Sequence, residues 1–508
     1  MYAAIGARLA SGELETCPGQ FGGSAPDPAA LERILLRAVR TRGPVTAAEL
    51  AGRYDVAEPA VAGALDAALA RGALRLLPDG TYIHVAVLDE IQRRQVHARR
   101  VVRAVASPEA FAAFVLRRQH VHPDHRLVGP PGLLKALEPL QGEDLPVKLW
   151  EQELLPARLE GYEPAWLDQL GLSGDIVWTP FERRAGRVGV ALRDNLGWLR
   201  EPTAEPSLGE HQKRILRQLE VRGASFVQEI ARGVALDGAV VLAALWELFW
   251  AGLVTPDSFQ AIRRGPEPAA ARRDRRRYRP AGAPLTAGGR WSAFAAEEAV
   301  TAEQGDEAWA HLLLARYGVV ARELARGDWS RLRHALLRME YGGEALRGYF
   351  VEGLSGEQYA LPEAVRELEA ERRRAEPHVL VSVCDPANLW GVAFPLLRLD
   401  GTRALTSRIP QNWLVLRGGR PVLLAEGHGR ELTRLSGWEA ADLGGVVAAL
   451  KSVIDRPLAL RPIRRLEVLT WDGTPARETE AGPALLDAGF TADGPRLSWD
   501  GYPGPARR

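Results

Sequence analysis

Residues 26–87 run PDPAALERILLRAVRTRGPVTAAELAGRYDVAEPAVAGALDAALARGALRLLPDGTYIHVAV and show the clearest local pattern in the chain. The first part predicts a helix, because apolar residues recur every three to four positions along one stripe: Leu31, Ile34, Leu35 and Val39. Thr46 is followed three residues later by Glu49. This spacing predicts a capping box at the start of a short second helix.

The rest of this stretch predicts a third helix and a hairpin. Val61, Leu65 and Leu69 follow one another at intervals of four, and Gly72 is a suitable C-cap. Two β-prone runs then flank Asp79-Gly80, a pair that is typical of tight hairpin turns. Three helices followed by a hairpin is the element order of a winged helix.

The same order recurs further along the chain, in residues 166–192, 208–258 and 308–354, with a shorter helical pair in 107–119 and 131–142. The spacing is irregular, which favours related modules in series over a solenoid. Winged helices commonly place the third helix in a DNA groove. Here the third helices, such as AVAGALDAALA, carry almost no side chain that could contact a base, so operator recognition by a transcription regulator is not expected. Each module can equally be scaffold or nucleic-acid contact.

The pattern changes after residue 376 to short β-prone runs, interrupted by one helix, LGGVVAALKSVI. Turns such as Gly418-Gly419 and Asp472-Gly473 separate the runs, which favours a barrel or a sandwich. The predicted fold class is α+β, with tandem winged-helix modules followed by a β-barrel-like C-terminal domain. The predicted boundaries are an N-terminal tail at 1–27, a winged helix at 28–105, winged-helix modules with a long wing at 106–206, a winged helix at 207–262, an Arg-rich linker at 263–289, a winged helix at 290–376 and a β-barrel domain at 377–508.

Composition describes an ordinary globular protein, with 46% apolar and 25% charged residues and a net charge of +1 over 508 residues. No run of about 18 uncharged apolar residues is present, so no membrane span is expected. The N-terminus lacks the basic and apolar regions of a secretory signal. Only two cysteines occur, Cys17 and Cys384, without a CxxC pair, which favours the reducing cytoplasm.

The linker is the most basic segment of the chain. Its arginines repel one another and are interrupted by proline and alanine, so it is not expected to bury a core. Guanidinium groups suit phosphate oxygens, which makes a nucleic-acid contact one interpretation and a merely solvated linker the other. The candidate nucleic-acid-binding residues are Arg272, Arg273, Arg275, Arg276, Arg277 and Arg279.

Several kinds of chemistry have no motif in this sequence. There is no GxxxxGK[ST] phosphate loop, so no ATPase or helicase activity is expected from these residues. Neither GxSxG nor HExxH occurs. The nearest approach to a metal site is the group of His120, His122 and His125, for which a polar surface loop is the favoured interpretation. No metal and no cofactor are predicted.

Taken together, a series of phrases resembles the C-terminal half of the Lhr family, the large helicase-related proteins of bacterial DNA repair. The phrases occur in family order: SPEAFAAFVLRRQ (107–119), LQGEDLPVKLWEQELLPARLEGYEPAWLDQL (140–170), SGDIVWT (173–179), GGRWSAF (288–294), LRGYFVEGLSGEQYALPEAV (346–365), CDPANLWGVAFP (384–395) and NWLVLRGGRPVLLAEG (412–427). The helicase core of the family is missing from this sequence. We therefore expect an excised domain or a stand-alone relative, with a helicase core in the same or a separate chain.

The resemblance implies winged helices with a β-barrel, related to the helix-turn-helix DNA glycosylases of the AlkZ/AlkX type. It also implies a homo-oligomer, often a tetramer, and uracil-DNA glycosylase activity of a monofunctional or lyase type. Relatives use a Gln-apolar-Gln motif. The similar positions here are Gln141 and Glu143 in LQGEDLP, although Gly142 departs from the apolar middle. A family aspartate near the C-terminus is tied to base excision, and Asp500 is the best match, with Asp493 as the fallback.

Those residue types suit the chemistry of base removal. Hydrolysis of an N-glycosidic bond passes through an oxocarbenium-like transition state, which a carboxylate stabilises directly or by activating water. The base must leave the stack, which is easiest in single-stranded or damaged DNA. Against these roles stand structural interpretations: Asp500 as a turn residue, Glu143 as a surface acid at a helix end and Gln358 as a support between a wing and a helix. The alternative function is a non-catalytic DNA- or RNA-binding assembly platform for a helicase.

Overall fold

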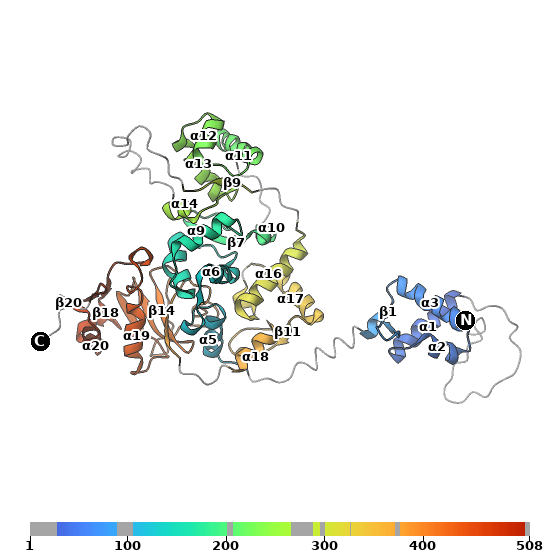
Figure 1. The fold of residues 1–508 in the computed structure, drawn as a ribbon. Coiled ribbons are helices and arrows are strands. Elements are labelled where there is room, and N and C mark those ends of the chain that lie inside the picture. Colours follow the sequence, from blue (N-terminus) through green and yellow to red (C-terminus); the bar gives the residue numbers. More distant parts are fainter. Residues whose placement is uncertain are drawn as a thin grey trace, which may run out of the picture. The chain divides into compact units, whose positions relative to one another are not determined.

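The computed structural model describes residues 28–88, 105–200, 207–265, 288–294, 300–325, 327–370 and 376–502 (Figure 1). The chain divides into two compact units, Met1–Val102 and Arg103–Arg508. The predicted N-terminal tail lies outside the described residues.

The first unit is a winged helix. Its elements are α1 (Pro28–Arg42), α2 (Ala47–Tyr54), α3 (Glu58–Ala70), β1 (Leu74–Leu76) and β2 (Tyr82–His84). The predicted capping box is confirmed: Glu49 N donates to Thr46 Oγ1 (3.2 Å) and Thr46 N donates to Glu49 Oε2 (2.8 Å). The strands pair antiparallel around the predicted Asp79-Gly80 turn, where Gly80 has a φ of 79°.

The core of this unit follows the predicted stripes. Leu31, Leu35 and Val39 of α1 are buried, and they pack with Val61 and Leu65 of α3. Ile34 and Leu69, which the stripes also contain, are half-buried at the edge of this core. Local periodicity was sufficient to predict the elements of this small domain, because the apolar stripe of each helix is visible in its own sequence.

The second unit begins with a larger module built around a hairpin. Its helices are α5 (Pro108–Arg118), α6 (Gly129–Leu137), α7 (Val147–Leu149), α8 (Leu155–Arg158), α9 (Pro164–Ser173) and α10 (Leu196–Leu199). Its strands are β3 (Leu127–Val128), β4 (Leu145–Pro146), β5 (Leu159–Glu160), β6 (Ile176–Thr179) and β7 (Arg187–Leu192). Strand β7 lies between β4 and β6. A single π-helical turn, Trp150–Leu154, joins α7 to α8. Such turns occur frequently at functional sites.

The next module contains α11 (Glu210–Arg222), α12 (Val227–Val234), α13 (Gly238–Trp250), β8 (Val254–Pro256), α14 (Phe259–Arg264) and β9 (Trp291–Ala293). Strand β9 pairs with β8, so residues from 291 onward close the wing of this module instead of beginning the next one at 290. Arg263 and Arg264, predicted as linker, end helix α14. No single described helix is long and apolar enough to cross a membrane; α12 and α13 pass that test only as a pair bent by 107°.

The last helical module contains α16 (Ala302–Tyr317), α17 (Trp329–Gly342), α18 (Pro362–Ala370), β10 (Val319–Val320), β11 (Leu346–Gly348) and β12 (Gln358–Ala360). Its strands form a sheet in the order β10-β12-β11. Gln358, on the central strand, is fully buried. Its side chain accepts hydrogen bonds from the backbone of Phe350 and Val351 and donates to Val351 O, all at 2.8 Å. The interpretation of Gln358 as a structural support is confirmed.

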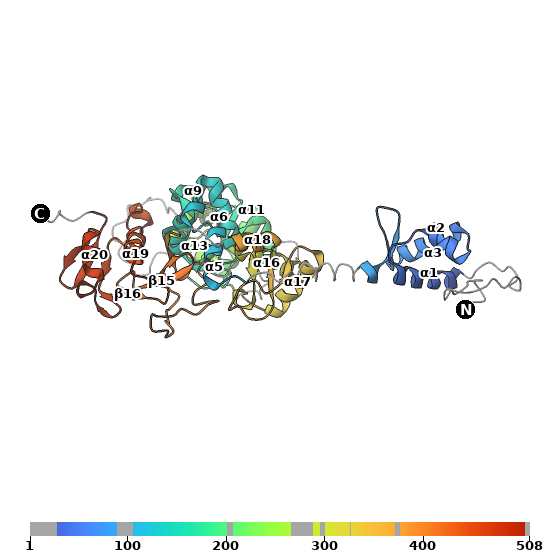
Figure 2. The ribbon, with the colours of Figure 1, turned by 90° about the horizontal axis from the view of Figure 1, so that it is seen from below.

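The C-terminal region consists of two open sheets and two helices. The six-stranded sheet has the order β13-β14-β15-β16-β18-β19, with β13 (His378–Ser382), β14 (Trp413–Arg417), β15 (Arg420–Glu426), β16 (Glu431–Arg434), β18 (Thr470–Trp471) and β19 (Thr474–Pro475). The three-stranded sheet has the order β17-β21-β20, with β17 (Leu466–Val468), β20 (Thr491–Asp493) and β21 (Arg496–Trp499). The helices are α19 (Asp442–Lys451) and α20 (Ala481–Asp487), which Figure 2 shows beside the strands.

The predicted β-barrel is wrong, because no closed sheet is formed by the described residues. Strands β13 and β19 are the two edges of the larger sheet. Its central strands are buried on both faces: Trp413 and Val415 belong to the core beneath α19, whereas Leu414 and Leu416 belong to the core that continues into the helical modules. A sheet covered on both sides has near-continuous apolar strands, as in NWLVL, and needs no closure to bury them.

Gly419 lies in the turn between β14 and β15, where this turn packs closely on α5. It has a φ of 75°, Trp390 Nε1 donates to its carbonyl oxygen (2.9 Å), and an added Cβ would collide with the α5 backbone at Glu109 and Ala113. We predict that Gly419→Ala lowers the free energy of unfolding by about 3 kcal/mol in urea denaturation, from strain plus overpacking.

The matched control is Gly401→Ala. Gly401 has a φ of 78° but no neighbouring atom within 4 Å of an added Cβ. Only the backbone strain applies there, so the expected loss is about 1 kcal/mol. Equal losses for the two variants would contradict the close packing of the turn on α5.

Candidate functional site

The LQGEDLP loop is buried inside the second unit. Gln141 is 3% exposed, and its side-chain oxygen accepts hydrogen bonds from Leu192 N and Asn195 Nδ2, both at 2.9 Å. Its side-chain nitrogen donates to Glu138 O (3.1 Å). The amide thus connects the loop to the end of the β6–β7 hairpin.

Glu143 is fully buried and forms an ion pair with Arg316 of α16. Arg316 also donates to two backbone carbonyl oxygens, that of Pro139 just before the loop (2.6 Å) and that of Gln141 within it (2.7 Å). The guanidinium therefore fastens the LQGEDLP loop to the last helical module. Glu143 is not the surface acid of the structural interpretation, because its carboxylate lies inside the core.

Asp500 lies elsewhere, directly after β21 of the three-stranded sheet. It is exposed, and its Oδ1 accepts a hydrogen bond from Tyr502 N (3.0 Å), as in an Asx turn. The fallback, Asp493, is exposed in β20. The structure thus places Gln141 and Glu143 in one buried loop and Asp500 on the surface of a different sheet.

Of the two other predicted groups, the linker arginines and the histidine loop, the structure describes only the histidine loop. The six candidate arginines of the linker, Arg272, Arg273, Arg275, Arg276, Arg277 and Arg279, lie outside the described residues. In the histidine loop, His122 is buried with Nε2 3.2 Å from Glu376 Oε2, and His120 Nδ1 lies 3.0 Å from His125 O. Within the described part of the chain, no group of three or more His, Cys, Asp or Glu side chains could hold a metal ion.

A buried polar cluster joins α8 to the C-terminal sheet. Arg158 makes two parallel hydrogen bonds to Asp385, Nη1–Oδ2 at 2.8 Å and Nη2–Oδ1 at 2.7 Å. Both side chains are almost fully buried. Arg158 also donates to Gln119 Oε1 (3.2 Å), and Gln119 Nε2 donates to Arg316 O (3.3 Å). This network connects the Arg158 guanidinium with the backbone of Arg316.

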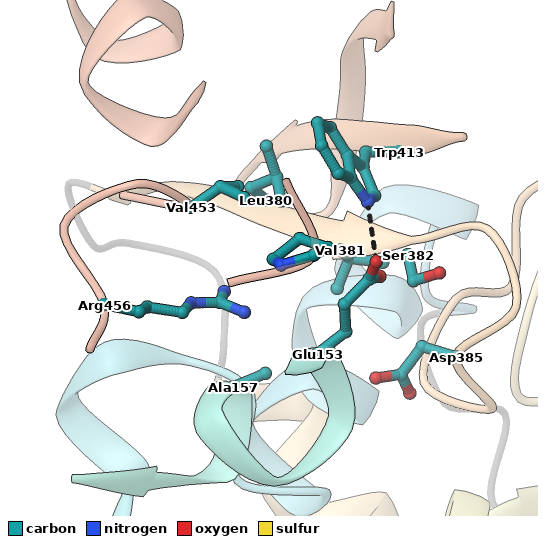
Figure 3. Close-up of a pocket in the computed structure, with 10 residues that line it drawn as sticks. Glu153, Ala157, Leu380, Val381, Ser382, Asp385, Trp413, Val453 and Arg456 are labelled. Carbon is teal, nitrogen blue, oxygen red and sulfur yellow. Dashed lines mark hydrogen bonds between the residues drawn. The ribbon is translucent and has the colours of Figure 1, made fainter. Parts of the chain in front are cut away.

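Glu153, on the π-helical turn, lies next to this cluster (Figure 3). Trp413 Nε1 donates to its Oε1 (3.1 Å), and its Oε2 has no hydrogen-bond partner among the described residues. Burial raises the pKa of the Glu153 carboxyl from 4.5 to about 7, against the lowering effects of Trp413, Ser382 and Arg456. A carboxyl with such a pKa can give or take a proton near neutral pH.

Two adjoining cavities lie in this region, and Glu153 lines the smaller one. The smaller one, lined by Glu153, Ser382, Asp385 and Arg456, has a volume of about 10 Å³, close to the minimum that one water molecule needs. The larger one is a cleft of about 310 Å³. They share three lining residues: Ala157, Leu380 and Arg456. Figure 3 shows the Arg456 guanidinium pointing toward the other residues that line the smaller cavity.

The sequence reasoning missed this cluster, although the phrases WEQELLPAR, CDPANLW and NWLVL contain most of it. The charged residues Glu153 and Arg158 lie in a mixed polar and apolar segment, LWEQELLPARLE. Charged side chains that are buried are expected to be paired. Their partners lie more than 200 positions away in the chain, for example Asp385 at a separation of 227 from Arg158. No local pattern indicates which residues these are.

Comparison with known protein families identifies two of these modules. Residues 106–193 match the third winged-helix domain of the large helicase-related protein, Lhr, and residues 299–380 match the fourth. The chain carries winged-helix domains of the Lhr family. The resemblance inferred from the sequence phrases is thereby confirmed, and the matched Lhr domains contain Gln141, Glu143, Glu153 and Arg316.

Two curated relatives align with almost the whole of this chain. One, from Mycolicibacterium smegmatis, is named "Lhr helicase/ probable uracil glycosylase" and is 30% identical over 516 residues, which covers 93% of this chain and 34% of the relative. The other, from Escherichia coli, is named "Lhr helicase/uracil glycosylase" and is 26% identical over 520 residues, which covers 92% of this chain and 33% of the relative. The chain therefore spans about a third of each relative's length.

The raised pKa of Glu153 predicts a specific pH dependence of stability. The folded protein keeps a proton that the unfolded chain releases above pH 4.5, so stability falls as the pH rises from about 4.5 to about 7. Glu153→Gln removes this titration. Relative to wild type, the variant should gain up to about 3 kcal/mol of unfolding free energy between pH 5 and pH 8.

Urea denaturation of both proteins at the two pH values measures this difference. Other titrating groups contribute equally to wild type and variant, so they cancel in the comparison. A stability difference that does not change with pH would show that Glu153 titrates normally in the folded protein.

Proposed function

We propose that this chain binds DNA and removes uracil or another damaged base from single-stranded DNA by hydrolysing the N-glycosidic bond. The observation that carries the proposal is the alignment of more than nine tenths of the chain with two relatives whose names include uracil glycosylase. Those names also include helicase. The glycosylase is the activity that needs no nucleotide-driven motor, and this sequence has no phosphate-binding loop motif.

The predicted catalytic residues differ in exposure, which supports a different proposed role for each. Asp500 is exposed, so its carboxylate can reach the sugar of a bound nucleotide and stabilise positive charge there or activate water. Gln141 and Glu143 can contact a substrate only if the loop that Arg316 holds were to open. We therefore propose Asp500 as the catalytic carboxylate and retain Gln141 and Glu143 as catalytic candidates that require such opening.

The direct test uses single-stranded DNA with one uracil, followed by alkali to cleave abasic sites. Wild type should give a cleaved product. Asp500→Asn should abolish the product while DNA binding is unchanged, because the amide keeps the turn but cannot carry the charge. Asp487→Asn, at an exposed position at the end of α20, is the matched control and should cleave like wild type.

The same assay separates enzyme from platform. If wild type in excess binds the strand but gives no product from uracil or other damaged bases, the glycosylase proposal fails and the non-catalytic assembly platform takes its place. The assembly itself is a separate proposal: we infer a homo-oligomer, with a tetramer expected from the family resemblance. Light scattering of the purified chain measures its mass directly.

A further inference from the structure

The cleft of about 310 Å³ is bounded by Ala157 of α8 and by three longer segments of the second unit. The first follows α5 and contributes Val121, Pro123 and Arg126; the second is β13; the third is α19 with the residues after it. Its volume lies at the lower end of the roughly 300–1,000 Å³ that small-molecule sites occupy. That space suits a single nucleotide better than a larger ligand.

Two arginines give the cleft its charge. Arg126 is exposed, and among the described residues its only hydrogen bond runs from Nε to Ala157 O (3.1 Å), so its terminal amino groups are available for a ligand. Arg456 donates from Nη1 to Gln152 O. Burial, and then the charge of Arg126, lower the pKa of Arg456 to about 10, although Glu153 opposes this. Two cations held this close would be relieved by an anion between them.

The opposite wall is small and apolar. Gly445, Ala448 and Ala449 of α19 line it, together with Ser452. An added Cβ at Gly445 would collide with the ring of His378, so the glycine allows that ring to lie against the helix. His378 Nε2 lies 2.8 Å from Asp442 Oδ1, so this imidazole is already paired with a carboxylate. The two arginines are therefore the main charged groups that face the cleft. A wall without long side chains can accept a sugar or a flat base.

We propose that this cleft binds one nucleotide of a DNA strand, with a phosphate held by Arg126 and Arg456 and the sugar or base against α19. The proposal rests on the proposed function for the identity of the strand. Arg126, Ala448 and Ser452 are all exposed, so the cleft opens to the surface and a continuous strand can enter and leave it. Guanidinium groups bind phosphate oxygens through two parallel hydrogen bonds.

Two variants test the cleft by different routes. Arg126→Gln removes one charge, and Ala448→Trp fills the space from an exposed position with no change in charge. Arg477→Gln is the matched control, because Arg477 is exposed in the C-terminal region but does not line the cleft. Binding to a fluorescein-labelled oligothymidylate of about 20 nucleotides is measured by anisotropy over a range of salt concentrations.

Both cleft variants should bind about tenfold more weakly at low salt, whereas Arg477→Gln should bind like wild type. For Arg126→Gln, the slope of log K against log salt should become shallower by about 0.7, the value for one lost phosphate contact on a single strand. Wild-type affinity and slope in both cleft variants would overturn the proposal. If Arg126→Gln is found to unfold, Ala448→Trp decides the question alone.

Two further arms separate this proposal from others. Thymidine 5′-monophosphate should compete weakly with the oligonucleotide for binding to wild type. If the free nucleotide competes but Ala448→Trp binds the oligonucleotide as tightly as wild type does, the cleft is a free-nucleotide site. That result would overturn the strand proposal. The uracil assay is run on the same samples. Absence of product from wild type, together with weakened binding by the cleft variants, would reject the glycosylase and leave the cleft standing.

Discussion

The buried ion pair between Arg158 and Asp385 is the interaction on which the second unit depends. Two charges removed from water are costly, and here that cost is offset by two parallel hydrogen bonds and by the further bonds of Arg158 to Gln119 and Leu154 O. Asp385 also accepts from Ala387 N (2.8 Å), which orders the turn after β13. The pair thus fixes α8 of the winged-helix module against the C-terminal sheet.

The cleft follows from this attachment. One of its arginines, Arg126, comes from the winged-helix module, while Arg456 and α19 come from the C-terminal region. Neither part has the complete set of groups by itself. Because β14 and β15 are covered on both faces, the sheet is a shared wall of two cores and keeps the parts in register. Binding and any chemistry at Glu153 therefore depend on contacts between segments far apart in the chain.

Local patterns predicted much of the helical architecture and little of the site. The capping box at Thr46, the Asp79-Gly80 turn and the stripe through Leu31 and Leu35 concern near neighbours, so they are visible in sequence. The barrel was wrong because short strands with glycine turns do not reveal what covers each face. Glu153 was missed because its raised pKa arises from burial among segments far apart in the chain, which only the tertiary structure brings together.

The central claim, that the winged-helix segments and the C-terminal sheet fold as one unit through the Arg158–Asp385 pair, is tested most directly by a double-mutant cycle. Arg158→Met, Asp385→Asn and the double variant are compared by urea denaturation. Each single change should cost about 3–5 kcal/mol, because it leaves a buried charge without its partner. The double variant should cost less than the sum by about 2 kcal/mol or more. Additive losses would contradict the claim.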